Sequence, residues 1–122
     1  AIWNGKVRLS AAGVQDKINV MKHPTQGLGF ADGAWVSTHL LKFESPNAPG
    51  LVINEWFTLQ LAKAAGLPVN HAEKIQIGKH SALLVERFDR RFNKDHTHVQ
   101  RKHTIDGCQL LNRDALQKYD VR

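Results

Sequence analysis

The sequence has 122 residues, a formal net charge of +6, 42% hydrophobic and 23% charged residues, which is the composition of one ordinary globular domain. No apolar run approaches the roughly 18 residues that cross a bilayer, and no basic-then-apolar leader is present. The single cysteine, Cys108, excludes an internal disulfide. We therefore expect a cytoplasmic protein without a membrane segment, whose positive charge favours an anionic partner: a nucleotide, a nucleic acid or an acidic protein.

The two ends of the chain carry no terminal signature. The sequence begins at Ala1-Ile2-Trp3 rather than at Met and stops at Tyr119-Asp120-Val121-Arg122. We expect a piece of a longer protein.

The first 50 residues alternate β-forming stretches with small-residue breaks. Residues 7–21 predict two short extended pieces around the turn Ala11-Ala12-Gly13. Residues 22–33 hold one proline and three glycines, which predicts a loop or a hairpin connection. Residues 34–43 are rich in β-formers and predict a strand with Lys42 near its end.

Residues 51–65 predict the main helix, because apolar side chains recur there every three or four positions, at Val52, Trp56 and Leu59. Gly66 follows at the position where a glycine commonly ends a helix.

The second half predicts strands followed by a short helix. The expected elements are antiparallel strands at 72–78 and 81–88, a polar connection at 89–96, a strand at 97–103 and a helix at 105–112 capped by Thr104. The whole order predicts an α+β fold, with an antiparallel sheet of about five strands and one main helix.

Three segments together favour a nucleotide site. Such a site needs a small-residue turn whose amides reach phosphate oxygens, a lysine on a strand, and a helix carboxylate that holds this lysine. Ser10-Ala11-Ala12-Gly13, Lys42 and Glu55 supply them in that order. Each alone has an ordinary explanation as a hairpin turn, a lysine reaching solvent or a solvated glutamate, so the prediction depends on their combination.

The apolar strand expected at 81–88 ends in a dense run of charges, Val85-Glu86-Arg87-Phe88-Asp89-Arg90. Its simple interpretation is a salt-bridged rim, which contributes little to stability. The alternative is a hinge whose main chain meets adenine while Phe88 packs beneath the base.

Five blocks of the sequence, in this order and at compatible spacing, resemble the HipA-type serine/threonine protein kinases of bacteria. They are Ser10-x-Ala12-Gly13-x-Gln15-x-Lys17, Thr38-His39-Leu40-Leu41-Lys42, Asn54-Glu55, Val85-Glu86-Arg87-Phe88-Asp89-Arg90, and Asp106-x-Cys108-Gln109 with Lys118-Tyr119 beyond. The resemblance implies the small lobe of a protein-kinase-like fold at residues 1–103. Residues 104–122 would begin the connection to a C-terminal lobe that the chain lacks.

The resemblance also implies an activity. Members of this family are toxins of toxin–antitoxin systems that use ATP and Mg²⁺ to phosphorylate serine on a protein substrate, notably an aminoacyl-tRNA synthetase. The implied cofactor-binding residues are Ala12, Gly13, Val14 and Gln15 at the phosphates, Lys42 at the α/β-phosphates with Glu55 as its orienting partner, and the backbone of Glu86 and Phe88 at adenine. Ser10 matches a serine that family members autophosphorylate, and a phosphoserine there would repel the nucleotide phosphates.

Catalysis itself is not expected of this segment. In the family, the catalytic Asp, the following Asn and the Mg²⁺-binding Asp lie beyond Tyr119, so the segment holds no catalytic residue and is predicted to be inactive alone. The implied partners are an antitoxin DNA-binding protein and the protein substrate, with no membrane. Apolar surface meant for the other lobe favours self-association of the segment.

Three alternatives stay open. His96, His98, His103 and Cys108 lie close together, but their spacing matches no closed zinc site, so we expect no metal. A stretch of basic residues interleaved with Phe88 and Phe92 favours nucleic-acid binding, although Asp89 and Asp95 interrupt it and favour a solvated face; its members are Arg87, Arg90, Arg91, Lys94, Arg101 and Lys102. The third alternative is a protein-interaction module that binds no nucleotide.

Overall fold

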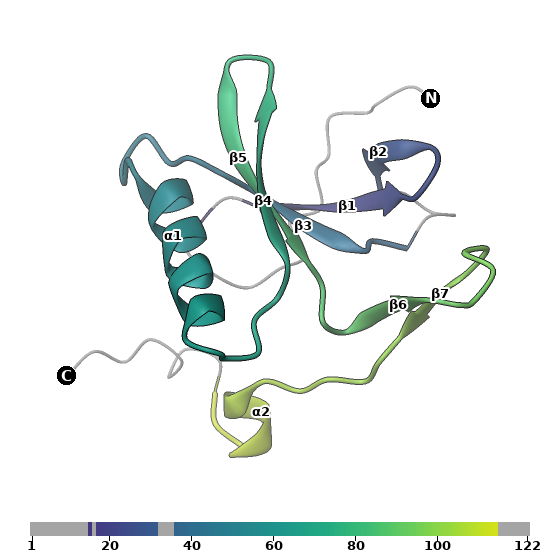
Figure 1. Cartoon of the computed structure of the whole chain (residues 1–122). Coiled ribbons are helices and arrows are strands. Elements are labelled where there is room, and N and C mark those ends of the chain that lie inside the picture. Colours follow the sequence, from purple (N-terminus) through teal and green to yellow (C-terminus); the bar gives the residue numbers. More distant parts are fainter. Residues whose placement is uncertain (1–14, 16, 32–35, 115–122) are drawn as a thin grey trace.

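The computed structural model describes residues 15, 17–31 and 36–114. A five-stranded antiparallel sheet in the order β2-β1-β3-β5-β4 carries the helix α1 on one face (Figure 1). A separate two-stranded ribbon, β6-β7, and the short helix α2 follow. The elements are β1 (Lys17–His23), β2 (Gly27–Phe30), β3 (His39–Phe43), α1 (Leu51–Ala64), β4 (Ala72–Ile77), β5 (His80–Glu86), β6 (Arg90–Phe92), β7 (Val99–Arg101) and α2 (Gly107–Leu110). This architecture confirms the predicted α+β class.

The core lies on both faces of the sheet, because side chains along a strand alternate between the two faces. On the helix side, Val52, Ala72, Leu83 and Val85 are buried together, with Trp56 and Leu59 packed against them. On the other side, Val20, Leu41, Ala82 and Leu84 form a second buried cluster. Strand β5 therefore contributes to both clusters. Since Leu41 belongs to the far cluster, its neighbours Leu40 and Lys42 project toward α1.

Helix α1 matches the predicted bounds and its predicted end. The amide of Leu67 donates to the carbonyl of Ala62 and that of Gly66 to the carbonyl of Lys63, both at 3.0 Å, with Gly66 at a φ of 79°. These two hydrogen bonds around a residue in the left-handed conformation form the Schellman motif. Glycine adopts this conformation without steric cost. At 14 residues, α1 is the longest described helix, and no helix among the described residues is long and apolar enough to cross a membrane.

The outer face of α1 departs from the predicted amphipathic pattern. Ile53, Phe57 and Leu61 follow one another at four-residue spacing and are 48%, 59% and 60% exposed. The helix thus presents apolar side chains both to the sheet and away from it.

The connection predicted at residues 22–33 contains a hairpin. Strand β1 continues to His23, and β2 pairs with it from Gly27 opposite His23 to Phe30 opposite Val20. Gly27 has a φ of 82°, a conformation that suits a tight turn and that only glycine adopts readily.

The C-terminal predictions needed two corrections. The polar connection at 89–96 contains β6, which pairs with β7 inside the predicted strand at 97–103. The predicted helix at 105–112 is observed only as the shorter α2. Its N-terminal cap is Asp106 rather than Thr104. The Asp106 side chain accepts from the amide of Gln109, and the Gln109 side chain accepts from the amide of Asp106, a capping box that satisfies two amides at once.

Candidate functional site

Lys42 and Glu55 meet between the sheet and the helix. The Lys42 Nζ lies 2.5 Å from the Glu55 Oε1, and the side chains are 20% and 30% exposed. Lys42 is the penultimate residue of β3 and faces α1, and Glu55 stands one turn into that helix. Most of each side chain is therefore shielded from water, which strengthens the contact relative to an ion pair on the open surface.

The short connection from β3 to α1 holds this pair in place. Gly50, the residue before α1, has no side chain with which to cap the helix, and the carboxylate of Glu44 takes that role: its Oε1 accepts from the amide of Leu51 at 2.8 Å. Glu44 comes directly after β3, so it ties the end of the strand to the start of the helix. This short, tied connection keeps Lys42 on the strand within reach of Glu55 on the helix.

Gln15, two residues before β1, is bound to the same corner. Its Nε2 donates to the carbonyl of Phe43 at 3.0 Å, one residue after Lys42. Gln15 is the only part of the predicted phosphate loop within the described residues; Ser10, Ala12, Gly13 and Val14 lie outside them.

A cleft of about 470 Å³ opens beside the Lys42–Glu55 pair, a volume within the range of small-molecule sites. It runs from the lysine along α1 to the segment that follows β5. Its lining residues are Leu40, Lys42, Glu55, Leu59, Pro68, Val69, Asn70, Val85, Glu86, Arg87, Phe88 and Asp89. The four predicted site residues within the described segments 36–114, namely Lys42, Glu55, Glu86 and Phe88, thus line one cleft.

The backbone after β5 is only partly available to a ligand. The amide of Glu86 donates to the carbonyl of His71 at 2.8 Å, and the amide of Arg87 donates to the carbonyl of Thr38 at 2.9 Å. The amide of Phe88 makes no hydrogen bond to another described residue, and its side chain is 67% exposed. The amide of Glu86 is therefore already used within the sheet, which leaves its carbonyl as the backbone group that a ligand could meet.

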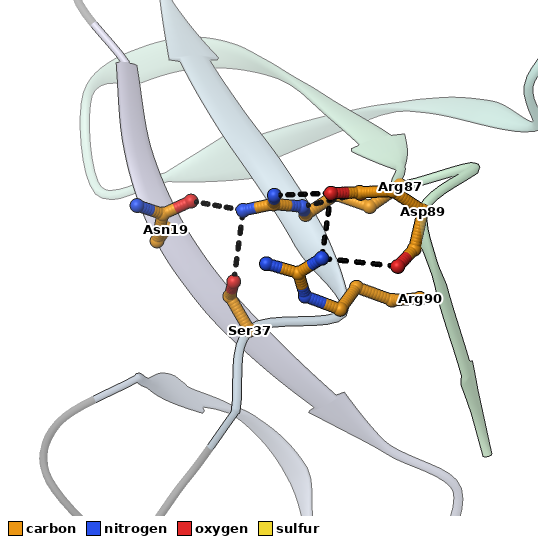
Figure 2. Close-up of polar contacts among 5 residues, drawn as sticks. All are labelled: Asn19, Ser37, Arg87, Asp89 and Arg90. Atoms are coloured by element: carbon orange, nitrogen blue, oxygen red, sulfur yellow. Dashed lines mark hydrogen bonds and ion pairs between the residues drawn. The ribbon is translucent and has the colours of Figure 1, made fainter. Parts of the chain in front are cut away.

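Two residues that line the cleft, Arg87 and Asp89, form a network with Arg90 (Figure 2). This is the run for which the sequence left a salt-bridged rim and a hinge as alternatives. The Arg87 guanidinium donates from Nε and Nη2 to the two oxygens of Asp89, at 2.9 and 2.8 Å, and Arg90 Nη1 reaches Asp89 Oδ2 at 2.5 Å. Asp89 is only 8% exposed. The hydrogen bonds from Arg87 hold the pKa of Asp89 below its ordinary value. The charged run is therefore salt-bridged, as its simple interpretation predicts, but the central Asp89 is buried rather than on an exposed rim.

The network also reaches across strand β3 to strand β1. Arg87 Nη1 donates to Asn19 Oδ1 at 2.9 Å and to Ser37 Oγ at 3.1 Å. Asn19 lies on β1 and Ser37 just before β3, 68 and 50 residues away from Arg87 in the sequence. Sequence reasoning missed both partners; the only local signal was an aspartate flanked by two arginines.

The basic stretch that favoured nucleic-acid binding does not form one continuous exposed surface, because two of its arginines pair with Asp89. Arg87 and Arg90 are directed at Asp89, and Phe92 packs edge-on against His23, with ring centroids 6.1 Å apart. The exposed cations that remain on the ribbon are Arg91, Lys94, Arg101 and Lys102. Within the described residues, no three His, Cys, Asp or Glu side chains gather in a way that could hold a metal ion.

A family model, a curated relative and a solved structure all relate this chain to HipA-like proteins. The family described as the HipA-like C-terminal domain matches residues 9–121. The serine/threonine-protein kinase toxin HipA of Shewanella oneidensis is 44% identical over 119 residues, which are 98% of this chain and 27% of that protein. A solved complex of HipA, HipB and operator DNA from Shewanella oneidensis MR-1 contains a chain that superposes with a TM-score of 0.76 at 43% identity, over 97% of this chain and 27% of that one.

The chain therefore spans about a quarter of the length of these relatives. The identity extends across nearly the whole chain, and the sheet, main helix and cleft described above lie within the matched region. The protein belongs to the family of HipA-like C-terminal domains.

Proposed function

We propose that this chain forms the ATP-binding part of a serine/threonine protein kinase. The observation that carries the proposal is the contact between Lys42 and Glu55 at the edge of a cleft that also reaches Glu86 and Phe88. A lysine held by a helix carboxylate is the group with which protein kinases hold nucleotide phosphates. The backbone from the last residue of β5 onward offers the carbonyl of Glu86 and the amide of Phe88 to the edge of the base.

In this proposal the two ends of the nucleotide contact different elements. The triphosphate lies at Lys42, next to Gln15 and the preceding loop, and adenine lies against Phe88. Mg²⁺ would supply positive charge at the phosphates, and the family resemblance places its protein ligands in the C-terminal lobe. Ser10 is the proposed site of regulatory phosphorylation, since a dianion there would repel the triphosphate.

The proposal extends to the longer protein. The names of the relatives support a toxin kinase that works with an antitoxin partner: one relative is called a serine/threonine-protein kinase toxin, and the solved complex contains HipB and operator DNA. We propose a protein substrate such as an aminoacyl-tRNA synthetase. We further propose that the 122-residue segment alone transfers no phosphate, because the family resemblance places the catalytic base and the metal ligands in the other lobe.

Nucleotide binding by the full-length protein tests the proposal. Lys42→Ala should abolish measurable binding of both Mg²⁺-ATP and tripolyphosphate by calorimetric titration, with little change in the melting temperature. Lys79→Ala is the matched control, because it removes an equal charge from an exposed turn on the same sheet. If Lys42→Ala bound ATP as tightly as the Lys79→Ala control, the proposed site would be refuted.

A further inference from the structure

The side chain of Arg87 connects three parts of the chain that are distant in sequence. It donates to Asn19 on β1, to Ser37 before β3 and, through two bonds, to Asp89. Its side chain is 19% exposed. Because the guanidinium is planar and presents its donors in fixed directions, four bonds to three partners define the position of Arg87 closely.

The backbone of Arg87 is held as well, and it begins a tight turn. Its amide donates to Thr38, and its carbonyl accepts from the amide of Arg90 at 3.3 Å. The carbonyl of Asp89 accepts from the amide of Lys102 at 2.9 Å. Phe88 is the one residue of this turn that forms no hydrogen bond with another described residue and exposes most of its side chain. The residues before and after it, Arg87 and Asp89, are both held by hydrogen bonds to other parts of the chain.

We infer that Arg87 is a positioning residue, which fixes the Glu86–Phe88 backbone against β1 so that the base end of the cleft keeps its shape. This inference rests on the proposed nucleotide site, and it concerns only the base. Arg87 and Lys42 both line the cleft, but the bonds of Arg87 go to Asn19, Ser37 and Asp89, whereas Lys42 is bound to Glu55. A change at Arg87 should therefore weaken recognition of adenine and leave recognition of the phosphates intact.

The experiment compares two ligands with the full-length protein: ATP, which has a base, and tripolyphosphate, which has none. Arg87→Gln should raise the dissociation constant of ATP about tenfold and leave that of tripolyphosphate within about twofold. Arg87→Lys keeps the charge beside Asp89 but cannot reach all three partners, so it should resemble Arg87→Gln. Arg91→Gln is the matched control, since it removes an exposed arginine from the neighbouring strand β6.

The outcomes separate the inference from the proposed function. Equal losses for both ligands, no loss for either, or full rescue by Arg87→Lys would overturn the positioning role. If the unaltered protein bound neither ligand, the proposed function would fail and the inference with it. Should Arg87→Gln not fold, Asn19→Ala removes a single partner, and the same selective loss for ATP, smaller in size, is expected; unchanged binding of both ligands would again refute the role.

Discussion

The carboxylate of Glu44 caps the helix that carries Glu55, accepting a hydrogen bond of 2.8 Å from the amide of Leu51. The acceptor comes from outside the helix, six residues before the capping position at Gly50. A negative charge at a helix N-terminus also interacts favourably with the helix dipole. Glu44 thus stabilises α1 and, through it, the placement of Glu55 opposite Lys42.

Replacing Glu44 should weaken the start of α1. Glu44→Ala leaves the Leu51 amide without its acceptor, and we expect a loss of about 1 kcal/mol in the free energy of unfolding, as for other lost caps. Chemical denaturation followed by circular dichroism measures it. Asp95→Ala, at an exposed position, is the control and should change stability much less; equal effects of the two substitutions would show that Glu44 is not a cap.

The Lys42–Glu55 pair should be measurable as a coupling energy without any nucleotide. A double-mutant cycle with Lys42→Met and Glu55→Gln is expected to give about 0.5–1 kcal/mol, because the pair is only partly shielded from water. The stability of the two single variants and the double variant gives this value. A coupling energy near zero would indicate that the two side chains do not interact in solution.

Asp89 should make stability depend on acid pH. Its pKa is lowered by the hydrogen bonds from Arg87, so the folded state binds this proton more weakly than the unfolded state does. The contribution is therefore complete above the unfolded pKa of about 3.9 and is lost as the pH falls toward the folded pKa. Between about pH 5 and pH 2, the free energy of unfolding should fall less for Asp89→Asn than for the unaltered protein. At pH 7, the variant should be the less stable of the two.

Glu73 provides the comparison for that experiment. A hydrogen bond from Lys22 lowers its pKa as well, but the side chain is 38% exposed, so solvent weakens the effect. Glu73→Gln should alter the acid dependence less than Asp89→Asn. The reverse order would contradict the assignment of Asp89 as the main buried acid.

The exposed apolar side chains of α1 should promote self-association of the 122-residue chain. Phe57, with 59% of its surface exposed, lies between Ile53 and Leu61 on the outer face. Phe57→Lys is expected to lower the association seen by sedimentation velocity without a loss of stability, since the side chain is outside the core. Leu28→Lys, on the edge strand β2, is the control; an equal effect there would place the contact elsewhere.

The sequence was sufficient where the signals are local. The periodicity of residues 51–65 and the glycine at 66 predicted α1 and its end, because the spacing of buried side chains and the left-handed terminal residue are both encoded within a few positions. The pairing of Lys42 with Glu55 was predicted from the arrangement that protein kinases use and from the family resemblance, and the structure brings the two side chains together.

Long-range partners could not be predicted in the same way. Arg87 finds Asn19 across 68 residues, and no local pattern specifies such a contact. The cap by Glu44 was missed because capping rules consider the residue that begins the helix, which here is Gly50. Strand β6 lies in a polar segment without apolar alternation, so only its pairing with β7 defines it.

Strand β5 is buried on both faces, with Ala82 and Leu83 fully inaccessible to solvent, and the backbone at Glu86–Phe88 continues directly from it. Amides in such a strand exchange with deuterium only when most of the fold opens. Residues 83–85 should therefore be among the last to exchange in the molecule. The segment proposed to meet adenine is thus attached to the part of the described fold that we expect to open last.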